Sequence, residues 1–326
     1  MNTRSFWAPG RVNLIGEFTD LSGGLVLPVA IDLGVRIECA VAERTLLTSD
    51  ALGGTSDDAD WGRYVGAVAE ELAESGRPAV GIGGTIHSTL PIGSGLSSSA
   101  ALEVAVATAL CAVAGFTLEP LELARAAQRA EFRAVSVPSG IMDQAVSVLG
   151  RAGHAILLDT ATLAYEYLPL PPRLALVVVD SGVSRRLESS AYAERRRELE
   201  AGHPGRVRHV TSENRRVSDV AAILREPNQP RLAELGDLFA EGHESLRRDF
   251  EVTIPELDLL VELAVESGAL AARMTGGGFG GSIVALVERG HADELAQRVL
   301  VEYRRRVGDR GATYVCSASD GARELT

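Results

Sequence analysis

The sequence predicts a protein of mixed α and β structure that is divided into two domains or lobes. Its 326 residues exceed the length of one typical domain. Runs that alternate between apolar and polar residues, as half-buried strands do, recur between apolar runs of helical length. A hydrophobic content of 46% and a charged content of 23% allow a large core and exclude a globally disordered chain.

The composition also excludes several classes of function. A net charge of −12 disfavours nonspecific binding to nucleic acid or to an anionic membrane. No window of the sequence is long and apolar enough to span a bilayer, so we expect a cytoplasmic protein without nucleic-acid or membrane partners. All 32 basic residues are arginines. The absence of lysine excludes a lysine-dependent P-loop, the protein-kinase lysine and Schiff-base chemistry.

The elements of the chain can be predicted in order. Strands are expected at 25–31, 35–41 and 84–90. Helices are expected at 100–114, 118–134, 183–200, 218–224, 230–247 and 255–266. The helix at 100–114 consists almost entirely of Ala, Val and Leu, which predicts burial on nearly every side. The proline-rich segment 168–172 is the best candidate for a linker, so we expect domains at 1–170 and 171–326.

A glycine- and serine-rich segment joins the strand at 84–90 to the helix at 100–114. Its residues are Gly93, Ser94, Gly95, Leu96, Ser97, Ser98 and Ser99. The glycines allow a tight turn and a close approach to a ligand, while the serines and the unpaired N–H groups of the helix offer hydrogen-bond donors. These features predict a phosphate-binding loop that needs no lysine. An ordinary strand-to-helix turn with a serine cap is the alternative.

Charged residues gather in two other irregular segments. Arg11, Glu17 and Asp20 lie within ten residues on a glycine-rich backbone. Carboxylates accept hydrogen bonds from sugar hydroxyls and arginine supplies a fixed positive charge, so this cluster indicates either hydroxyl recognition or a charged surface loop. Asp143 follows Gly140 in the first turn of a short apolar helix. It can serve there as a partner of the helix dipole or as a general base.

The segment 275–281 contains the spacing G-x-G-x-x-G. We expect a helix before it and a strand at 282–287 after it, which is the reverse of the order in a dinucleotide-binding motif. The sequence therefore predicts no NAD site. So many glycines still indicate close backbone approach, either to the phosphates of a nucleotide or to another loop.

Taken together, three separated segments resemble the three signature motifs of the GHMP small-molecule kinases. They are Pro9–Glu17 followed by Thr19-Asp20, then Gly95–Ala100, and finally Thr275–Gly281. The first segment is similar to the motif of the galactokinase branch of that family. The resemblance continues at Gly140–Gln144 and at Ser190–Tyr192, so it covers nearly the whole chain. It implies two α+β lobes, the first like the second domain of ribosomal protein S5, with the active site in the cleft between them.

The resemblance also implies ATP-dependent phosphorylation of a sugar at its anomeric hydroxyl, with galactose as the leading substrate and Mg²⁺ as the cofactor. Asp143 is implied to be the base that faces the C1 hydroxyl, and Arg11 to be its cationic partner. The implied sugar contacts are Glu17, Phe18, Asp20, Gly140 and Tyr192. The implied nucleotide contacts are Trp61 near the adenine and the loop Gly93–Ser99 at the phosphates, with Ser99 and Glu131 as magnesium ligands. We expect a monomer.

Two positions depart from the galactokinase pattern. Phe18 and Leu21 stand where that family generally has His and Tyr. The family's His lies toward C6 of the sugar, and one lost neutral hydrogen bond costs only about 0.5–1.5 kcal/mol, so galactose stays the first choice. The alternative substrates are galacto-configured sugars with an altered C6 side, such as L-arabinose, a deoxy sugar or a galacturonate.

Two other classes of protein share part of this pattern. A non-catalytic sensor of galactose and ATP would tend to have a damaged phosphate loop, whereas Ser97, Ser98 and Ser99 are all present here. A kinase of homoserine or mevalonate type would share the glycine- and serine-rich loop but not the cluster from Glu17 to Asp20. Release of ADP in the presence of a sugar separates an enzyme from a sensor.

Overall fold

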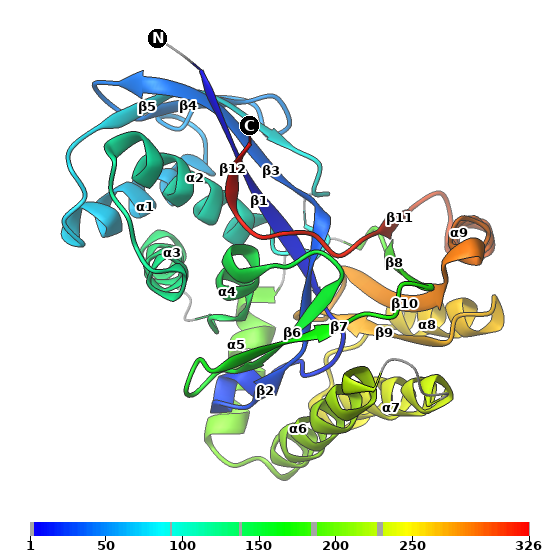
Figure 1. Ribbon diagram of the computed structural model, residues 1–326. Helices are drawn as coiled ribbons and strands as arrows, with labels where there is room; N and C mark the ends of the chain where they lie inside the picture. Colours follow the sequence, from blue (N-terminus) through cyan, green and yellow to red (C-terminus); the bar gives the residue numbers. More distant parts are fainter. Residues whose placement is uncertain (1–2, 92, 137–138, 184–187, 227–230, 326) are drawn as a thin grey trace.

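The computed structural model describes residues 3–91, 93–136, 139–183, 188–226 and 231–325, and helices pack on each of its two main sheets (Figure 1). The first sheet contains β1 (Arg4–Asn13), β3 (Pro28–Ala42), β4 (Leu46–Ser49), β5 (Gly81–Ser88) and β12 (Arg323–Leu325). Their order is β12-β1-β3-β5-β4, and only β4 and β5 are parallel neighbours. Because β12 pairs with β1, the end of the chain returns to the lobe in which the chain begins.

Helices of the first lobe pack together beside this sheet. They are α1 (Gly62–Glu74), α2 (Ser98–Ala114), α3 (Pro120–Val135) and α4 (Met142–Leu149). Helix α2 lies at their centre and contacts β1 and β3. Apart from Thr108, every residue from Ala100 to Leu110 is buried, which confirms the predicted burial of this helix on nearly every side. Its many alanines allow the close approach to the sheet.

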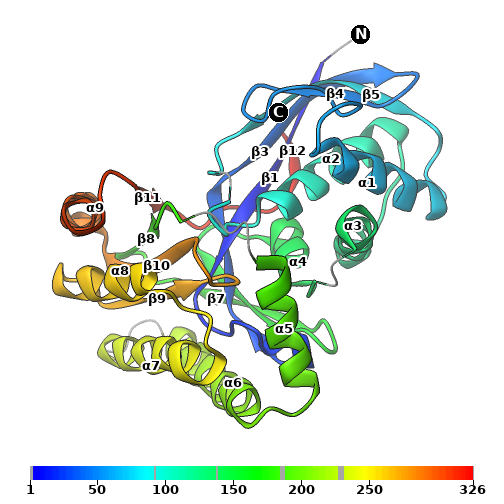
Figure 2. The same ribbon diagram turned by 180° about the vertical axis from the view of Figure 1, so that it is seen from behind.

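The second sheet has the order β11-β8-β10-β9 and is antiparallel throughout. Its strands are β8 (Leu174–Asp180), β9 (Ala271–Thr275), β10 (Ser282–Glu288) and β11 (Ala312–Cys316). The helices of this lobe are α5 (Glu188–Glu200), α6 (Pro204–Arg225), α7 (Leu232–Ser245), α8 (Pro255–Glu266) and α9 (Ala292–Val307). Leu176 and Val178 of β8 join the large core of the first lobe, whereas Val177 and Val179 pack in a second core with α8 and α9. Figure 2 shows these two helices beside the second sheet. Strand β8 is therefore buried on both faces.

A third, small sheet lies where the two lobes meet. It consists of β2 (Leu25–Val26), β6 (His154–Asp159) and β7 (Tyr165–Pro169), and β6 contacts β3 while β7 contacts α6. The remaining short elements are the turns η1 (Thr19–Ser22) and η3 (Arg289–His291) and the π-helical turn η2 (Leu246–Phe250). A domain boundary at residue 170 would fall just after β7 and stays a prediction. Within the described parts of the chain, no helix is long and apolar enough to cross a membrane.

Three predicted elements differ in the structure. The strands expected at 25–31 and 35–41 are largely one strand, β3, because Gly34 is extended and lets β1 approach: a Cβ there would lie 2.4 Å from the carbonyl oxygen of Ala8. The helix expected at 218–224 begins at Pro204, because its polar residues are paired in a buried network. The glycine-rich segment 275–281 follows strand β9 directly and joins it to β10. In a dinucleotide-binding motif a helix follows the glycines, whereas here strand β10 follows them.

Candidate active site

Arg11 and Asp143 form a bidentate ion pair where the lobes meet. Arg11 Nε donates to Asp143 Oδ1 at 2.8 Å, and Nη2 donates to Oδ2 at 2.9 Å. Strand β1 buries Arg11, whereas the first turn of α4 leaves the Asp143 side chain 31% exposed. Arg11 Nη1 also donates to the carbonyl oxygen of Gly95 at 2.7 Å. The guanidinium therefore holds one carboxylate next to the predicted phosphate loop.

The predicted phosphate loop has the backbone that its glycines allow. Gly93, Gly95 and Ser97 have φ values of 74°, 79° and 60°. These values are in the left-handed region that glycine enters freely, and Ser97 is held there by a hydrogen bond from its hydroxyl to Asp143 Oδ2. Because that hydroxyl is used in this way, no side chain caps the start of α2. The first N–H groups of the helix remain available to an anion.

A second carboxylate lies close to this pair. Burial, together with the charge of Asp143, raises the pKa of Asp20 to about 6. A Cβ atom on Gly140 would lie only 1.8 Å from Asp20 Oδ2, so no larger residue fits there. Burial and the charges of Asp20 and Asp143 likewise raise the pKa of Tyr192. The structure thus brings Asp20, Gly140, Asp143 and Tyr192 together from three segments of the chain.

Asp20 and Gly140 line an open, mainly polar cavity of about 460 Å³. Its other lining residues include Leu21, Arg125, Arg129 and Arg196. Hydrogen-bond acceptors and donors therefore face the same space, which is the surface that a molecule rich in hydroxyl groups requires.

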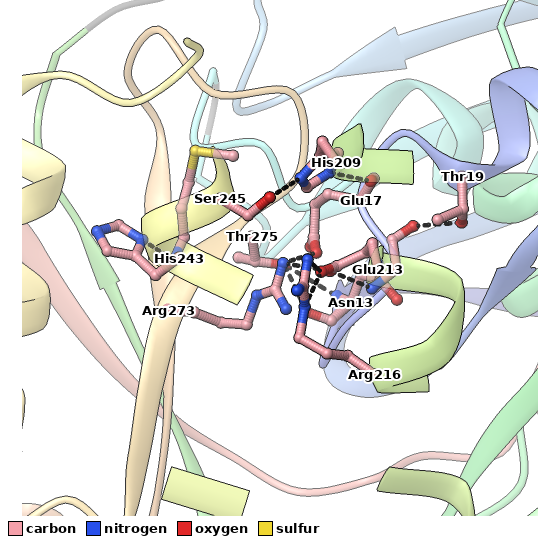
Figure 3. Close-up of polar contacts among 12 residues, drawn as sticks. Asn13, Glu17, Thr19, His209, Glu213, Arg216, His243, Ser245, Arg273 and Thr275 are labelled. Atoms are coloured by element: carbon pink, nitrogen blue, oxygen red, sulfur yellow. Dashed lines mark hydrogen bonds and ion pairs between the residues drawn. The ribbon is translucent and has the colours of Figure 1, made fainter. Parts of the chain in front are cut away.

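Glu17 lies elsewhere than the sequence predicts. Its side chain is 1% exposed, and its Oε2 accepts a hydrogen bond of 2.7 Å from Nη2 of the fully buried Arg273 (Figure 3). The same nitrogen donates to Glu213 Oε1 at 2.7 Å. Gly276 N donates to Glu17 Oε1 at 3.4 Å. Both carboxylate oxygens of Glu17 thus have partners inside the protein, so its side chain does not face the cavity beside Asp20.

Phe18 is also inside the protein. Only 5% of it is exposed, and its ring stacks on that of Phe250 with centroids 4.2 Å apart. The ring of Tyr192 lies 5.8 Å away. Phe18 therefore supports Tyr192 from the second core, where an apolar ring is favoured over a polar one.

An apolar cavity of about 180 Å³ opens beside the start of α2. Its lining includes Leu52, Trp61, Tyr64, Ser98 and Ser99. Trp61 is 8% exposed, and its Nε1 donates to the carbonyl oxygen of Gly53 at 2.9 Å. The indole is thus fixed in the wall of an apolar space that adjoins the phosphate loop, where an aromatic base would fit.

Ser99 and Glu131, the predicted magnesium ligands, are adjacent. Ser99 Oγ donates to Glu131 Oε1 at 3.1 Å, and Ser139 Oγ donates to Oε2 at 2.5 Å. Among the residues that the structure describes, no cluster of three or more His, Cys, Asp or Glu side chains could hold a metal. Two oxygen ligands nevertheless fit Mg²⁺, because this ion usually keeps several waters and binds to substrate phosphates.

The glycine-rich segment 275–281 contacts the first motif, and Ser282 directly after it contacts the phosphate loop. Asn13 N donates to Thr275 Oγ1 at 2.9 Å, and Ser282 Oγ donates to the carbonyl oxygen of Ser94 at 2.7 Å. A Cβ on Gly278 would lie 2.3 Å from the carbonyl oxygen of Val252. The glycines allow close approach either to the phosphates of a nucleotide or to another loop. The contacts that the structure describes for this segment are with other loops of the protein.

Four buried polar residues near the site were given no role by the sequence analysis: Glu103, Gln144, Glu213 and Arg273. Two of them interrupt apolar runs, since Glu103 stands in Ala-Ala-Leu-Glu-Val-Ala and Arg273 in Leu-Ala-Ala-Arg-Met. A charged residue within such a run is the signal that could have revealed them, because it is buried only when it is neutral or has a partner.

Comparison with known families agrees with this geometry. The model of the GHMP kinases N terminal domain matches residues 63–151, and that of the GHMP kinases C terminal matches residues 220–304. The galactokinase galactose-binding signature matches residues 2–41. Fold and site together define a small-molecule kinase of the GHMP class.

Individual relatives narrow this class. A galactokinase from Roseiflexus sp. (strain RS-1) is 39% identical over 361 aligned positions, which cover 96% of this chain and 91% of that protein. The crystal structure of Lactococcus lactis galactokinase complexed with galactose is 31% identical, with a TM-score of 0.92 over 99% of this chain and 95% of that one. The chain belongs to the galactokinase family. Mevalonate kinase from Methanococcus jannaschii, 18% identical with a TM-score of 0.76 over 98% of each chain, shares the fold.

Proposed function

We propose that this chain transfers the γ-phosphoryl group of ATP to the anomeric hydroxyl of galactose, giving galactose 1-phosphate and ADP. Membership in the galactokinase family supports the reaction. The observation that carries the proposal is the position of the Arg11 guanidinium, which contacts both Asp143 and the carbonyl oxygen of Gly95. A sugar hydroxyl at Asp143 would therefore lie next to the terminal phosphate of a nucleotide bound at the loop.

Asp143 accepts a hydrogen bond from the anomeric hydroxyl in this proposal and orients its oxygen toward phosphorus. Arg11 neutralises the charge that develops as the hydroxyl proton passes to Asp143 and the phosphoryl group moves from ADP to the sugar oxygen. Asp20, Gly140 and Tyr192 hold the other hydroxyls of the sugar. Glu17 acts indirectly, because its carboxylate binds Arg273 and thereby fixes the backbone that carries Asp20.

The nucleotide is proposed to bind along the start of α2. Its adenine enters the apolar cavity at Trp61, and its phosphates accept hydrogen bonds from the backbone and hydroxyls of residues 93–99. Ser99 and Glu131 would hold Mg²⁺, which supplies neutralisation of charge on the phosphates when it is bound.

Release of ADP in the presence of different sugars tests the proposed function. Galactose, L-arabinose, a 6-deoxy sugar and a galacturonate are compared at equal concentration, with the variant Asp143→Asn as the inactive control. We expect galactose to give the highest kcat/KM. If the kcat/KM for another sugar exceeds that for galactose by more than about a hundredfold, which is about 2.7 kcal/mol, the choice of galactose is wrong. The site would then recognise a different group on the C6 side of the sugar. Binding of galactose without ADP release would favour the sensor.

The enzyme is also proposed to act as a cytoplasmic monomer. Cys39, Cys111 and Cys316 are all buried and unpaired in the structure, as is usual in a reducing compartment. Light scattering after gel filtration should give the mass of one chain, 34.4 kDa. A mass of twice that value would contradict the monomer.

A further inference from the structure

A glutamate that the proposed reaction does not use is buried one helical turn beyond the phosphate loop. Glu103 lies on α2 and is fully buried, and nearly all of its neighbours on that helix are apolar. Its Oε2 accepts a hydrogen bond of 3.0 Å from Nε2 of Gln144. No arginine makes a described contact with it. Burial of a carboxylate without a cation is costly unless the group is neutral.

Gln144 links this glutamate to the proposed magnesium site. It follows Asp143 on α4 and is fully buried. The same Nε2 that donates to Glu103 also donates to Glu131 Oε2 at 3.1 Å. One amide nitrogen therefore lies between a carboxyl group of α2 and a carboxyl group of α3, and α4 carries that nitrogen. Any change in the orientation of Gln144 moves its hydrogen bond to Glu131.

Two atoms of this arrangement have no partner among the described residues. They are Oε1 of Glu103 and Oε1 of Gln144, and both are buried. Two acceptors cannot bond to each other, but a proton on Glu103 Oε1 turns that oxygen into a donor. A neutral carboxylic acid and a primary amide can then exchange two hydrogen bonds, which would satisfy both atoms at once.

The electrostatic surroundings favour the neutral acid. Burial, and then the charge of Glu131 on α3, raise the pKa of Glu103 well above its ordinary value. Asp143 on α4 acts in the same direction, and Gln144 opposes it. Tyr64 on α1 also interacts with this carboxyl. Among the described residues, the two carboxylates that shift the pKa of Glu103 thus both raise it.

We propose that Glu103 and Gln144 form a buried acid–amide pair that positions the carboxylate of Glu131 beside Ser99. Glu103 and Gln144 are both positioning residues, because it is Glu131 and Ser99 that would contact the metal and the nucleotide. The role of Glu131 as a magnesium ligand rests on the proposed function. The protonation and pairing of Glu103 do not.

Two substitutions that nearly keep the size of the Glu103 side chain test whether this residue is a neutral acid or a carboxylate. Glu103→Gln can exchange the same two hydrogen bonds with Gln144, whereas Glu103→Leu can form neither. We expect Glu103→Gln to keep kcat and the Mg²⁺ requirement within about threefold of the wild type. Glu103→Leu should raise the Mg²⁺ concentration for half-maximal rate by about tenfold, with little change in the KM for galactose. Equal damage by both variants would overturn the proposal.

Infrared spectroscopy tests the pair without any activity. At about pH 9, Glu17 and Asp20 are ionised, since their pKa values are about 7 and 6. The wild type should still show the C=O stretch of a protonated carboxyl group, and Glu103→Gln should lack it. Glu122→Gln, at an exposed position of α3, is the matched control and should retain the band. A wild-type spectrum without the band would overturn the proposal, even if Glu103→Leu does not fold and whichever sugar the enzyme phosphorylates.

Discussion

The carboxylate of Glu17 lies 2.7 Å from the guanidinium of Arg273, and the protein encloses both groups. Glu213 approaches the same guanidinium nitrogen at 2.7 Å and is itself bound by Arg216 (Figure 3). The backbone N–H of Gly16 also donates to Glu213. Glu17 belongs to the first motif and Arg273 to the strand that leads into the third. Their ion pair therefore joins two segments that are more than 250 residues apart in the sequence.

The first prediction concerns this ion pair. Arg273→Met should lower the free energy of unfolding by about 3–5 kcal/mol, because it leaves Glu17 and Glu213 buried without their shared cation. Urea unfolding measures the change. The control is Arg298→Met, since Arg298 pairs with Glu294 on the surface of α9 and its loss should cost about 0.5 kcal/mol or less. A loss below about 1 kcal/mol for Arg273→Met would show that the pair adds little to stability.

The second prediction concerns stability at acid pH. His209 is fully buried, with its ring nitrogens 2.9 Å from Ser245 Oγ and 3.1 Å from the carbonyl oxygen of Glu17. Burial lowers its pKa from 6.5 to about 4. The folded state thus binds the proton on His209 more weakly than the unfolded state does. The stability contributed by the neutral imidazole is therefore complete above pH 6.5 and is lost as the pH falls toward 4. The shift corresponds to roughly 3 kcal/mol.

Unfolding of His209→Gln and of the wild type should be compared from pH 7 down to about pH 4. The variant should lack this part of the decline. The free energy of unfolding of the variant is subtracted from that of the wild type at each pH, because Glu17 contributes a pH dependence of its own. Burial raises the pKa of Glu17 to about 7, and the stability from that group falls as the pH rises. His291→Gln, at an exposed position, is the control and should follow the wild type. Parallel curves for His209→Gln and the wild type would mean that another group causes the acid unfolding.

The third prediction concerns Asp143. Asp143→Asn keeps the size of the side chain but removes the charge that Arg11 binds, and it replaces one of the two acceptor oxygens by an amide group that donates. We expect kcat to fall by about 10²–10⁴-fold, while the affinity for galactose, measured by calorimetry, changes much less. A kcat near that of the wild type would remove Asp143 from the mechanism.

The fourth prediction concerns the space between Gly140 and Asp20. In Gly140→Ala the new methyl group would lie 1.8 Å from Asp20 Oδ2 and must displace that carboxylate. The KM for galactose should therefore rise by about tenfold or more, with a smaller change in the KM for ATP. Gly66→Ala is the control, because a Cβ there meets nothing within 4 Å. Equal changes in both KM values would indicate a general distortion of the cleft.

Local patterns were sufficient to predict much of the fold. The apolar residues from 100 to 114 predicted the buried helix α2, and the glycine and serine residues before it predicted a loop with free N–H groups. The three motifs predicted the kinase family, and the comparisons confirm it. Arg11 and Asp143 were predicted as partners, and they form an ion pair. That pairing, between residues 132 positions apart, was implied by the family resemblance, whereas the helix and the loop were predicted from residue type and short spacing along the chain.

The partners of the acidic residues were decided by the tertiary structure alone. The sequence identified Glu17 and Asp20 as similar carboxylates three residues apart, yet Asp20 lines a cavity while Glu17 is paired with Arg273. Glu103 looked like one polar residue in an apolar helix until Gln144 was found against it. A sequence shows which groups can ionise or donate a hydrogen bond. Which groups do so depends on burial and on partners that the fold brings from distant segments, and these set the cost of each charge.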